Sequence, residues 1–339
     1  MARLPFNAPA GFAYAARLSG WKLAGNTLIA SAWLSSENDA EVQITCAGEG
    51  IWRICFTPGG DPLPSLPILA RSVEPQPLSI SETPARLLAV CAGYALAIDR
   101  DPWRLSLLDR DGKTVCRENP TDVDGLNRPF SLPLGFVKGP DGRVSQVVES
   151  FHLSPHEHLC GLGEKFTRLD KTGQRIVSWN LDALGAASER SYKNVPFLLS
   201  SLGYGLFLNT GRRCRFDLAT TSCETYTLTV DGPYLDLYLF AGASPAEILE
   251  KYTSLTGRAP VPPKWSFGLW LSGSGIYRDE AAIRGLAGGV EQHDIPCDVI
   301  HIDPWWMRWR KYADFQWDKQ AFPDPEKLIA DLHDRGLRL

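Results

Sequence analysis

The chain has 339 residues, of which 44% are hydrophobic, and a formal net charge of −4 at pH 7. This length and apolar content suffice for about two domains with buried cores. The slight negative charge provides no attraction to nucleic acid or to an anionic membrane surface, so neither is an expected partner. Eleven tryptophans and ten tyrosines offer flat aromatic faces that suit a core and also suit sugar rings.

The amino-terminal residues contain no unbroken apolar stretch of signal-peptide length, and no later segment is long and apolar enough to span a bilayer. Eight cysteines are scattered along the chain without a C-x-x-C pair, several of them in apolar, strand-like runs. This pattern predicts buried free thiols in a cytoplasmic protein.

Residues 10–240 show the pattern of short antiparallel strands. In residues 225–240, TYTLTVDGPYLDLYLF, large apolar or aromatic residues alternate with threonines up to a turn at Asp231 and Gly232. After the turn, leucines alternate with tyrosine and aspartate. Further turn signals, among them GGDP, DRDGK and GPDGR, recur at short intervals. The spacing predicts an antiparallel β-sandwich over residues 1–243.

The pattern becomes helical at Ser244. Ser244 and Glu247 form a capping box, Pro245 takes the first helical position, and Gly257 follows the last turn. These residues predict a linker helix over 244–257, with Leu249 on its apolar face. The stiff segment RAPVPP comes next and is typical of a domain boundary.

Residues 258–339 predict a different architecture. KWSFGLWLS and CDVIHID are expected to form buried strands, each followed by an amphipathic helical segment, and LRL opens a third strand. Near-continuous apolar strands that alternate with helices indicate a parallel sheet. A closed (β/α)8 barrel needs about 250 residues, so a barrel that starts here is expected to be truncated.

Asp303 stands at the carboxyl end of the second of these strands, directly before Pro304, Trp305 and Trp306. Side chains at this end of parallel strands line the ligand crevice of α/β folds. The position favours a ligand-binding carboxylate. A structural carboxylate that caps nearby backbone amides is the alternative.

Two other motifs do not establish a site. His152, His156 and His158 lie near Cys160, but they show neither the H-E-x-x-H spacing nor the paired C-x-x-C spacing of zinc sites, so no metal is expected. GLGEKF, residues 161–166, lacks the third glycine of a dinucleotide-binding loop, and no cofactor is expected.

Several segments nevertheless form an ordered set. They are GLGEKF, WNLDA (179–183), SYKNVPFLLSSLGYGLFLNT (191–210), TGRAPVPPKWSFGLWLS (256–272), IPCDVIHIDPWWM (295–307) and DFQWDKQAFPDPEKLIADLHDRGLRL (314–339). Together they resemble glycoside hydrolase family 31, the family of α-glucosidases and α-xylosidases. The first 150 residues or so fit the amino-terminal sandwich of that family without a distinctive motif.

The resemblance implies an N-terminal antiparallel β-sandwich, a linker helix, and then, in residues 258–339, the first βα units of a truncated (β/α)8 catalytic barrel. It assigns substrate binding to four residues. Asp303 would bind a hydroxyl of the sugar at the cleavage site, and Pro304 and Trp305 would shape the pocket wall. Asp182 would reach the same sugar from a loop of the sandwich domain.

The family's chemistry uses two more carboxylates, a nucleophile and an acid/base, which lie about 5 Å apart in a retaining enzyme. By resemblance both are aspartates on later barrel strands, so no catalytic residue is expected in this chain. Asp314 and Asp318 fall in a family motif and are expected to order a barrel loop.

The implied function is that of the N-terminal part of a retaining α-glycosidase that hydrolyses terminal non-reducing α-linked xylosyl residues. Glucosidases of the family commonly have an acid where this chain has Trp305, and an indole there would fill the space of the hydroxymethyl group of glucose. Gly273 and Gly275 open room nearby unless Tyr277 fills it.

Other readings remain open: an α-glucosidase of the same family, a lyase or transglycosylase on the same scaffold, and a carbohydrate-binding chain without activity. The expected partner is an α-linked xylosyl or glucosyl oligosaccharide. A homo-oligomeric full-length form is compatible with all of them.

The 339-residue chain by itself is expected to show no glycosidase activity. By resemblance, both carboxylates that carry out the chemistry lie outside it, and their loss removes many powers of ten in rate. Incubation of the purified chain with p-nitrophenyl α-xyloside and p-nitrophenyl α-glucoside checks this. Turnover in a contaminant-free preparation would show that the chemistry resides in residues assigned here to binding.

Overall fold

The computed structural model describes residues 8–118, 131–273 and 275–339. The chain forms two compact units, Met1–Arg258 and Ala259–Leu339, and each is considered by itself. The predicted linker helix falls within the first unit. No helix in the described ranges has the length and apolarity needed to cross a bilayer.

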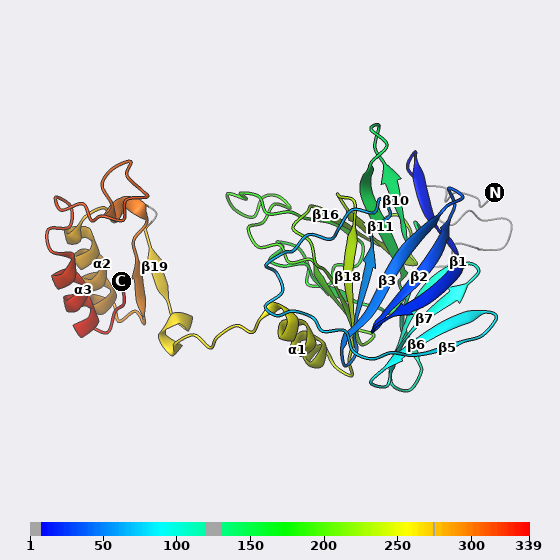
Figure 1. Ribbon diagram of the computed structural model, residues 1–339. Helices are drawn as coiled ribbons and strands as arrows, with labels where there is room; N and C mark the ends of the chain where they lie inside the picture. Colours follow the sequence, from blue (N-terminus) through cyan, green and yellow to red (C-terminus); the bar gives the residue numbers. More distant parts are fainter. Residues whose placement is uncertain (1–7, 119–130, 274) are drawn as a thin grey trace. The chain divides into compact units, whose positions relative to one another are not determined.

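Antiparallel strands are the main regular structure of the first unit (Figure 1), and thirteen of them form one continuous sheet. The strands of this sheet are β1 (Phe12–Ala24), β2 (Thr27–Leu34), β3 (Asp39–Gly48), β4 (Ile51–Phe56), β10 (Gly135–Lys138), β11 (Val144–His152), β12 (Leu159–Gly161), β13 (Gln174–Ser178), β14 (Phe197–Ser200), β15 (Tyr204–Leu208), β16 (Cys214–Leu218), β17 (Thr225–Val230) and β18 (Leu235–Ala241). β1 joins the two halves, because its first residues pair with β10 and the rest pair with β2.

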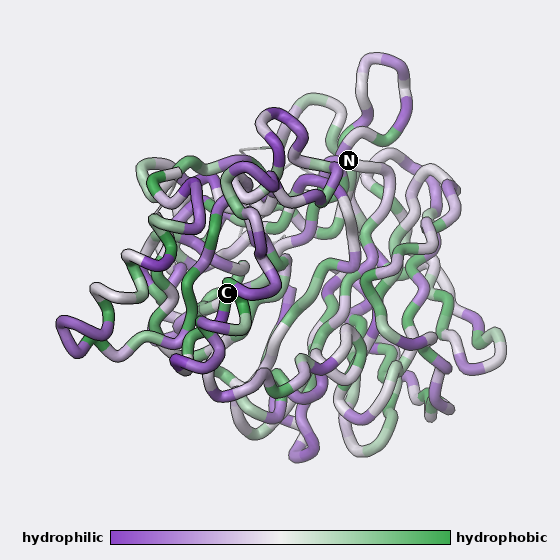
Figure 2. The backbone as a smooth tube through the Cα atoms, turned by 90° about the vertical axis from the view of Figure 1, so that its left-hand side faces the viewer, coloured by the Kyte–Doolittle hydropathy of each residue, from purple (hydrophilic) through white to green (hydrophobic). Residues whose placement is uncertain are grey.

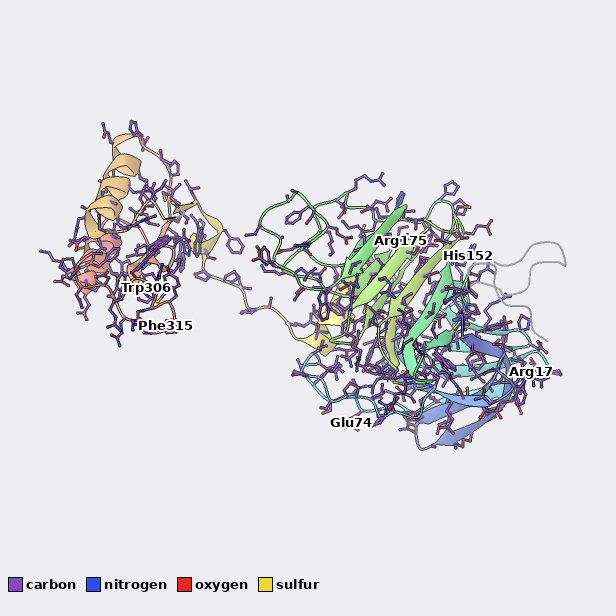
Figure 3. All side chains as sticks on the ribbon, turned by 90° about the horizontal axis from the view of Figure 1, so that it is seen from above. Arg17, Glu74, His152, Arg175, Trp306 and Phe315 are labelled. Carbon is purple, nitrogen blue, oxygen red and sulfur yellow. The ribbon has the colours of Figure 1, made fainter. Side chains whose placement is uncertain are left out.

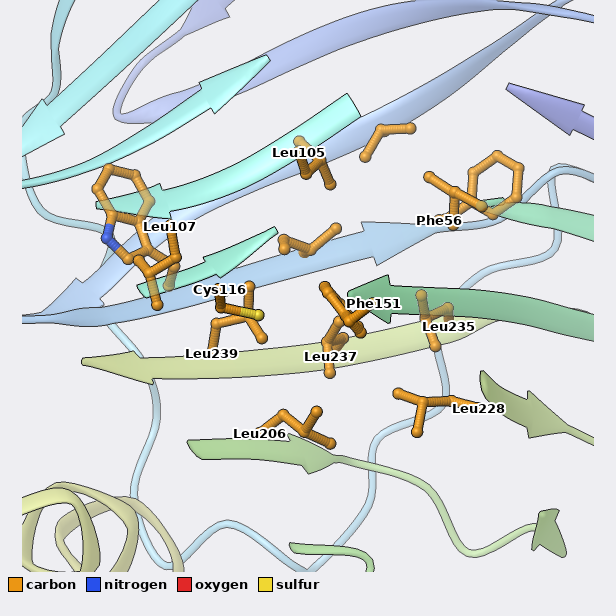
Figure 4. Close-up of a cluster of buried hydrophobic side chains, with 14 of the residues drawn as sticks. Phe56, Leu105, Leu107, Cys116, Phe151, Leu206, Leu228, Leu235, Leu237 and Leu239 are labelled. Atoms are coloured by element: carbon orange, nitrogen blue, oxygen red, sulfur yellow. The ribbon is translucent and has the colours of Figure 1, made fainter. Parts of the chain in front are cut away.

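A second sheet is a five-stranded antiparallel meander of β5 (Ser79–Glu82), β6 (Arg86–Cys91), β7 (Tyr94–Arg100), β8 (Trp103–Leu108) and β9 (Thr114–Arg117). One large hydrophobic cluster draws buried side chains from this sheet and from both halves of the thirteen-stranded sheet. Figure 4 shows part of this core, where Leu105 and Leu107 of β8 face Leu237 and Leu239 of β18. Hydrophobic and hydrophilic residues both occur along the extended segments (Figure 2), as in β2, where buried and partly buried residues alternate.

The strands predicted for residues 225–240 are present as β17 and β18, but they are not partners. β17 pairs with β11 and β16, whereas β18 pairs with β15 and β4. All seven residues of β18 are buried, including Asp236. The turn at Asp231 and Gly232 therefore carries the chain from one half of the large sheet to the other.

All eight cysteines are free thiols. The prediction that they are buried holds for Cys46, Cys55, Cys91, Cys116 and Cys214, but Cys223 is exposed, and two others are partly buried. Cys223 lies in the loop before β17 rather than in a strand, so it has no place in the core.

Helix α1 (Pro245–Thr256) begins and ends where the sequence predicts. The Ser244 hydroxyl accepts a hydrogen bond from the backbone N–H of Glu247, which is one half of the predicted capping box. Ile248 and Leu255 are buried against the large sheet, but Leu249 is 44% exposed. The prediction for Leu249 was wrong because the sheet covers a narrower stripe of the helix than the apolar residues span.

The second unit contains η1 (Lys264–Phe267), β19 (Trp270–Ser272), α2 (Glu280–Gln292), β20 (Val299–His301), η2 (Pro304–Trp306) and α3 (Pro325–Asp334). β19 and β20 pair in parallel, and Arg338 forms a parallel bridge with Val299 on the other side of β20. The predicted alternation is present as β19, α2, β20 and α3, whereas the third predicted strand is represented only by the isolated bridge of Arg338.

The predicted strand over 264–272 is shorter than expected and is not buried. Its first half forms the turn of 3-10 helix η1, and only three residues form β19. Trp270 is 48% exposed and Phe267 is 74% exposed. In the part of the chain that the structure describes, no apolar layer covers this face, so hydrophobic composition alone was a poor guide to burial here.

Two carboxyl groups, Glu118 and Glu149, lie in the core of the first unit at 1% and 0% exposure. One oxygen of each accepts a backbone N–H, from Leu105 and Ser150 respectively, while Glu118 Oε1 and Glu149 Oε2 have no donor among the described groups. Burial raises the pKa of Glu118 to about 7 and raises the pKa of Glu149 well above its ordinary range. A proton on this pair lets one carboxyl donate to the other.

The unfolded chain ionises both groups near pH 4.3, so unfolding releases protons and stability falls as pH rises from about 4.5 towards 7. We expect Glu149→Gln, whose amide donates to Glu118 without a proton from solvent, to flatten this decline and raise the free energy of unfolding at pH 7.5. Urea unfolding at several pH values from 5 to 7.5 measures it. Glu41→Gln, on the surface, is the control and should follow the unmodified chain; an unchanged slope for Glu149→Gln would contradict the shared proton.

Candidate substrate-binding site

Asp303 lies two residues after the end of β20 and occupies the N-cap position of η2, but its side chain makes no capping hydrogen bond. The residue is partly buried, and its carboxylate has no hydrogen bond or ion pair with any described residue. A carboxylate removed from water without donors loses solvation free energy. The alternative of a structural capping carboxylate is therefore not supported.

Neighbouring acids in the same unit have clear structural partners. Asp279 and Asp324 cap α2 and α3 by accepting the backbone N–H of Ala282 at 2.8 Å and of Lys327 at 3.0 Å.

In the loop after η2, Asp314 pairs with Arg308 through two hydrogen bonds. Asp318 accepts the backbone N–H of Gln320 at 3.0 Å, and its own N–H donates to Trp306 O at 2.9 Å. The prediction that Asp314 and Asp318 order this loop is confirmed.

Asp298, at the other end of β20, is also partly buried, and its carboxylate has no hydrogen-bond or ion-pair partner among the described residues. It lies before the strand rather than after it. Ligands of parallel α/β sheets bind at the carboxyl ends of strands. Position therefore distinguishes Asp303 from Asp298, and Asp298 provides a matched comparison.

Trp305 is held by aromatic and cationic contacts. Its ring stacks on Trp309 with centroids 5.0 Å apart and planes at 15°, and the guanidinium carbon of Arg278 lies 4.7 Å from the ring centroid. Tyr312 meets both indoles edge-on. These contacts fix the indole next to Asp303, so it can serve as a rigid wall.

The loop glycines are both close to aromatic rings. A Cβ atom on Gly275 would lie 2.7 Å from the indole nitrogen of Trp305, and a Cβ on Gly273 would lie 2.3 Å from the ring of Tyr277. The room opened by the two glycines is therefore occupied. Tyr277 fills it on one side and Trp305 on the other.

A separate apolar pocket of about 340 Å³ lies along β20. Trp265, Trp270, Trp306 and Trp317 contribute to its lining, whereas Asp303 and Trp305 do not. Of the residues labelled in Figure 3, Trp306 belongs to this pocket, while Phe315 is 76% exposed on the loop that follows. The two adjacent tryptophans of the sequence thus have different surroundings, which their adjacency did not predict.

In the first unit, Asp182 lies exposed in the loop after β13. Its Oδ1 accepts the hydroxyl of Tyr192 at 2.5 Å and the backbone N–H of Leu184 at 3.3 Å. Oδ2 has no hydrogen bond with a described residue. The carboxylate is oriented on one side and free to accept on the other.

Asn194 ties this loop to the next one. Its side-chain amide donates to the backbone oxygens of Trp179 and Ser191, at 2.9 and 3.0 Å, and to Asn180 Oδ1 at 2.9 Å. Gly163 supports the same segment, because a Cβ there would lie 2.2 Å from Lys193 O. Tyr192 and Asn194 position Asp182 and its loop, a role that the SYKNVPF motif in which both stand did not reveal.

No cluster of three or more potential metal-ligating side chains occurs in the described ranges. His158 instead pairs with Asp170 at 2.8 Å, and Lys193 lies 3.4 Å from Glu164.

Comparisons with known proteins match residues 41–217 to the glycosyl hydrolase 31 N-terminal galactose mutarotase-like domain and residues 259–339 to the glycosyl hydrolases family 31 TIM-barrel domain. The chain belongs to glycoside hydrolase family 31. It therefore comprises the N-terminal domain of this family and the start of its TIM-barrel domain. The family resemblance read from the sequence is confirmed.

Among relatives, α-xylosidase XylQ of Lactiplantibacillus pentosus is 38% identical over 209 residues, which is 61% of this chain and 27% of the relative. α-Glucosidase 2 of Bacillus thermoamyloliquefaciens is 30% identical over 306 residues, 88% of this chain and 36% of the relative. The chain thus spans about a third or less of the length of these relatives.

Solved structures share the fold. A Flavobacterium johnsoniae family 31 dextranase complexed with glucose matches with a TM-score of 0.81 at 23% identity, covering 96% of this chain and 38% of the dextranase. A family 31 α-xylosidase from a soil metagenome, complexed with xylose, matches with a TM-score of 0.76 at 22% identity, covering 94% and 46% of the two chains.

The free energy of unfolding tests whether Asp303 lacks a structural hydrogen-bond partner. Asp303→Ala should change the free energy of unfolding by less than about 0.5 kcal/mol or raise it, because no hydrogen bond is lost. Asp324→Ala, the control in the same unit, should lower it by about 1 kcal/mol, because it removes an N-cap. Urea unfolding of the two variants gives both values. A loss for Asp303→Ala as large as that for Asp324→Ala would mean that Asp303 is structural.

Proposed function

We propose that the protein to which this chain belongs is a retaining α-glycosidase that removes terminal non-reducing α-linked xylosyl residues. In this proposal Asp303 and Asp182 accept hydrogen bonds from sugar hydroxyls, and Pro304 and Trp305 form the wall of the pocket. The observation that carries it is the Asp303 carboxylate, which lies just beyond the carboxyl end of β20 without a donor from any described residue. A ligand rich in hydroxyl groups supplies the hydrogen-bond donors that the described residues do not provide.

The substrate is inferred from the rigidity of Trp305. Xylose lacks the hydroxymethyl group that glucose carries at C5, so a fixed indole beside the ring admits xylose more easily. Arg278 and Trp309 hold that indole, and Gly275 lies against its nitrogen. Tyr277 occupies the space beside Gly273 and so removes the main argument for a wider pocket.

α-Glucosidase is the second candidate function. It is favoured by the similarity to α-glucosidase 2, which extends over 88% of this chain. The α-xylosidase relative has the higher identity, 38% against 30%. Both candidates share one reaction class and the same role for Asp303.

No residue of this chain is assigned to bond cleavage. Its side chains would bind and orient the sugar, and a fixed orientation of the anomeric carbon lowers the barrier for attack by a carboxylate elsewhere in the protein. A hydroxyl held by Asp303 in a site closed to water experiences a stronger electrostatic interaction than in bulk solvent.

The full-length protein is expected to prefer p-nitrophenyl α-xyloside over the α-glucoside by about 10- to 200-fold in kcat/KM, the range that pocket shape provides. Trp305→Asp should shift the ratio towards the glucoside, because the acid opens space and offers a hydroxyl partner. Steady-state kinetics on both substrates measures it.

Trp305→Phe, which keeps an aromatic wall, is the matched control and should retain the preference. Asp298→Ala should leave both kcat/KM values unchanged, whereas Asp303→Ala should lower both. Equal kcat/KM for the two substrates in the unmodified enzyme, or no shift in Trp305→Asp, would favour the α-glucosidase.

A further inference from the structure

The first unit contains a pocket of about 290 Å³ whose lining includes none of the four residues assigned to the hydrolysed sugar. It lies between the end of β13 and the loops before β14 and β16. Its lining includes Trp179, Asn180, Asn194, Thr210, Gly211 and Arg212. The volume is at the lower end of the range for small-molecule pockets, about 300–1,000 Å³, and suits a single ring.

The free groups of this pocket are an aromatic face and hydrogen-bond donors. Trp179 is 44% exposed. Asn180 uses its side-chain oxygen to accept two bonds from Asn194, at 3.0 and 2.9 Å, and its NH2 group has no acceptor among the described residues. An indole face beside an amide donor provides both contacts that a sugar ring requires.

Arg212 adds a positive charge without a counter-ion. Its guanidinium has no hydrogen bond or ion pair with a described residue, and none of the lining residues is acidic. The side chain is exposed, and its stem packs on neighbouring residues. A Cβ on Gly232 would lie 2.3 Å from Arg212 Cδ, so the stem lies directly over the glycine, and the guanidinium carbon is 5.8 Å from the ring centroid of Tyr234.

We propose that this pocket binds a pyranose that carries a carboxylate, such as a uronic acid. The ring lies on the indole of Trp179, the carboxylate pairs with the guanidinium of Arg212, and Asn180 donates to a ring substituent. A planar guanidinium matches a carboxylate through two parallel hydrogen bonds. A neutral sugar leaves this cation unpaired, and a small inorganic anion makes no use of the aromatic face. The site requires neither Asp303 nor hydrolysis.

Isothermal titration of the full 339-residue chain with D-glucuronate, D-glucose and acetate tests the proposal. Glucuronate should bind at least about 10-fold more tightly than glucose or acetate, since only it engages both the ring face and the cation. Raising the salt concentration should weaken glucuronate binding and leave glucose binding unchanged.

Arg212→Gln should abolish the preference for glucuronate, and Trp179→Ala should weaken binding of both sugars. Arg213→Gln is the matched control, because Arg213 is the adjacent exposed arginine and does not line the pocket. Glucuronate binding should be unchanged in it.

A variant that adds bulk to the pocket tests the proposal without removing any side chain that contacts the ligand. Gly211 belongs to the pocket lining and a Cβ there meets nothing within 4 Å, so Gly211→Leu places a bulky side chain at the pocket without a clash and should weaken glucuronate binding. Gly20→Leu, equally uncrowded but in β1, is its control. Asp303→Ala should still bind glucuronate, so failure of the proposed hydrolysis leaves this test intact. Equal affinity for glucose and glucuronate, or glucuronate binding that survives Arg212→Gln, overturns the proposal.

Discussion

The cost of taking a carboxylate out of water governs both units of this chain. An ionised carboxylate in a protein interior needs donors in place of the water it loses. Asp236, 4% exposed in β18, receives two hydrogen bonds from Arg53 at 2.7 and 2.8 Å and one from Asn209 at 2.7 Å. Glu157, also 4% exposed, accepts from Ser200 and Tyr204 and from a backbone N–H. Where the protein does supply donors, a buried acid is part of the scaffold.

The same need for hydrogen-bond donors applies to Asp182 and Asp303, which the described residues satisfy only in part or not at all. Asp182 is half satisfied, because Tyr192 and a backbone N–H occupy one oxygen and leave the other free. Asp303 accepts nothing from the described residues. The more completely a carboxylate is bonded by its own protein, the less a ligand gains by binding to it. The two acids proposed to bind the sugar both keep an oxygen free to accept from a ligand, a property that Asp298 shares, so position along β20 is what distinguishes Asp303.

Local features of the fold were predictable from the sequence, because they depend on residues close together in the chain. The predicted cap Ser244 accepts the backbone N–H of Glu247, and helix α1 begins directly after it. The strands of residues 225–240 were also visible from alternation.

Features that depend on distant residues were not predictable. The partners of β17 and β18 lie far away in the sequence, so the pattern that revealed both strands did not reveal that they belong to different halves of the sheet. The exposure of Trp270 in β19 depends on which elements cover the strand, and an apolar sequence does not identify those elements. In the site, residue type and position identified Asp303, whereas the absence of a donor around it is a property of the whole surrounding fold.

Selectivity for a sugar follows from how the wall beside Asp303 is fixed. A free indole could move aside for a hydroxymethyl group at little cost, so Trp305 alone would discriminate weakly. Here the indole stacks on Trp309, lies under the guanidinium of Arg278, and touches a loop that only Gly275 allows to approach so closely. To admit a larger ring, the loop would have to give up these contacts together, and the lost free energy would count against glucose. The proposed preference for xylose therefore rests on the packing behind Trp305 as much as on the indole itself.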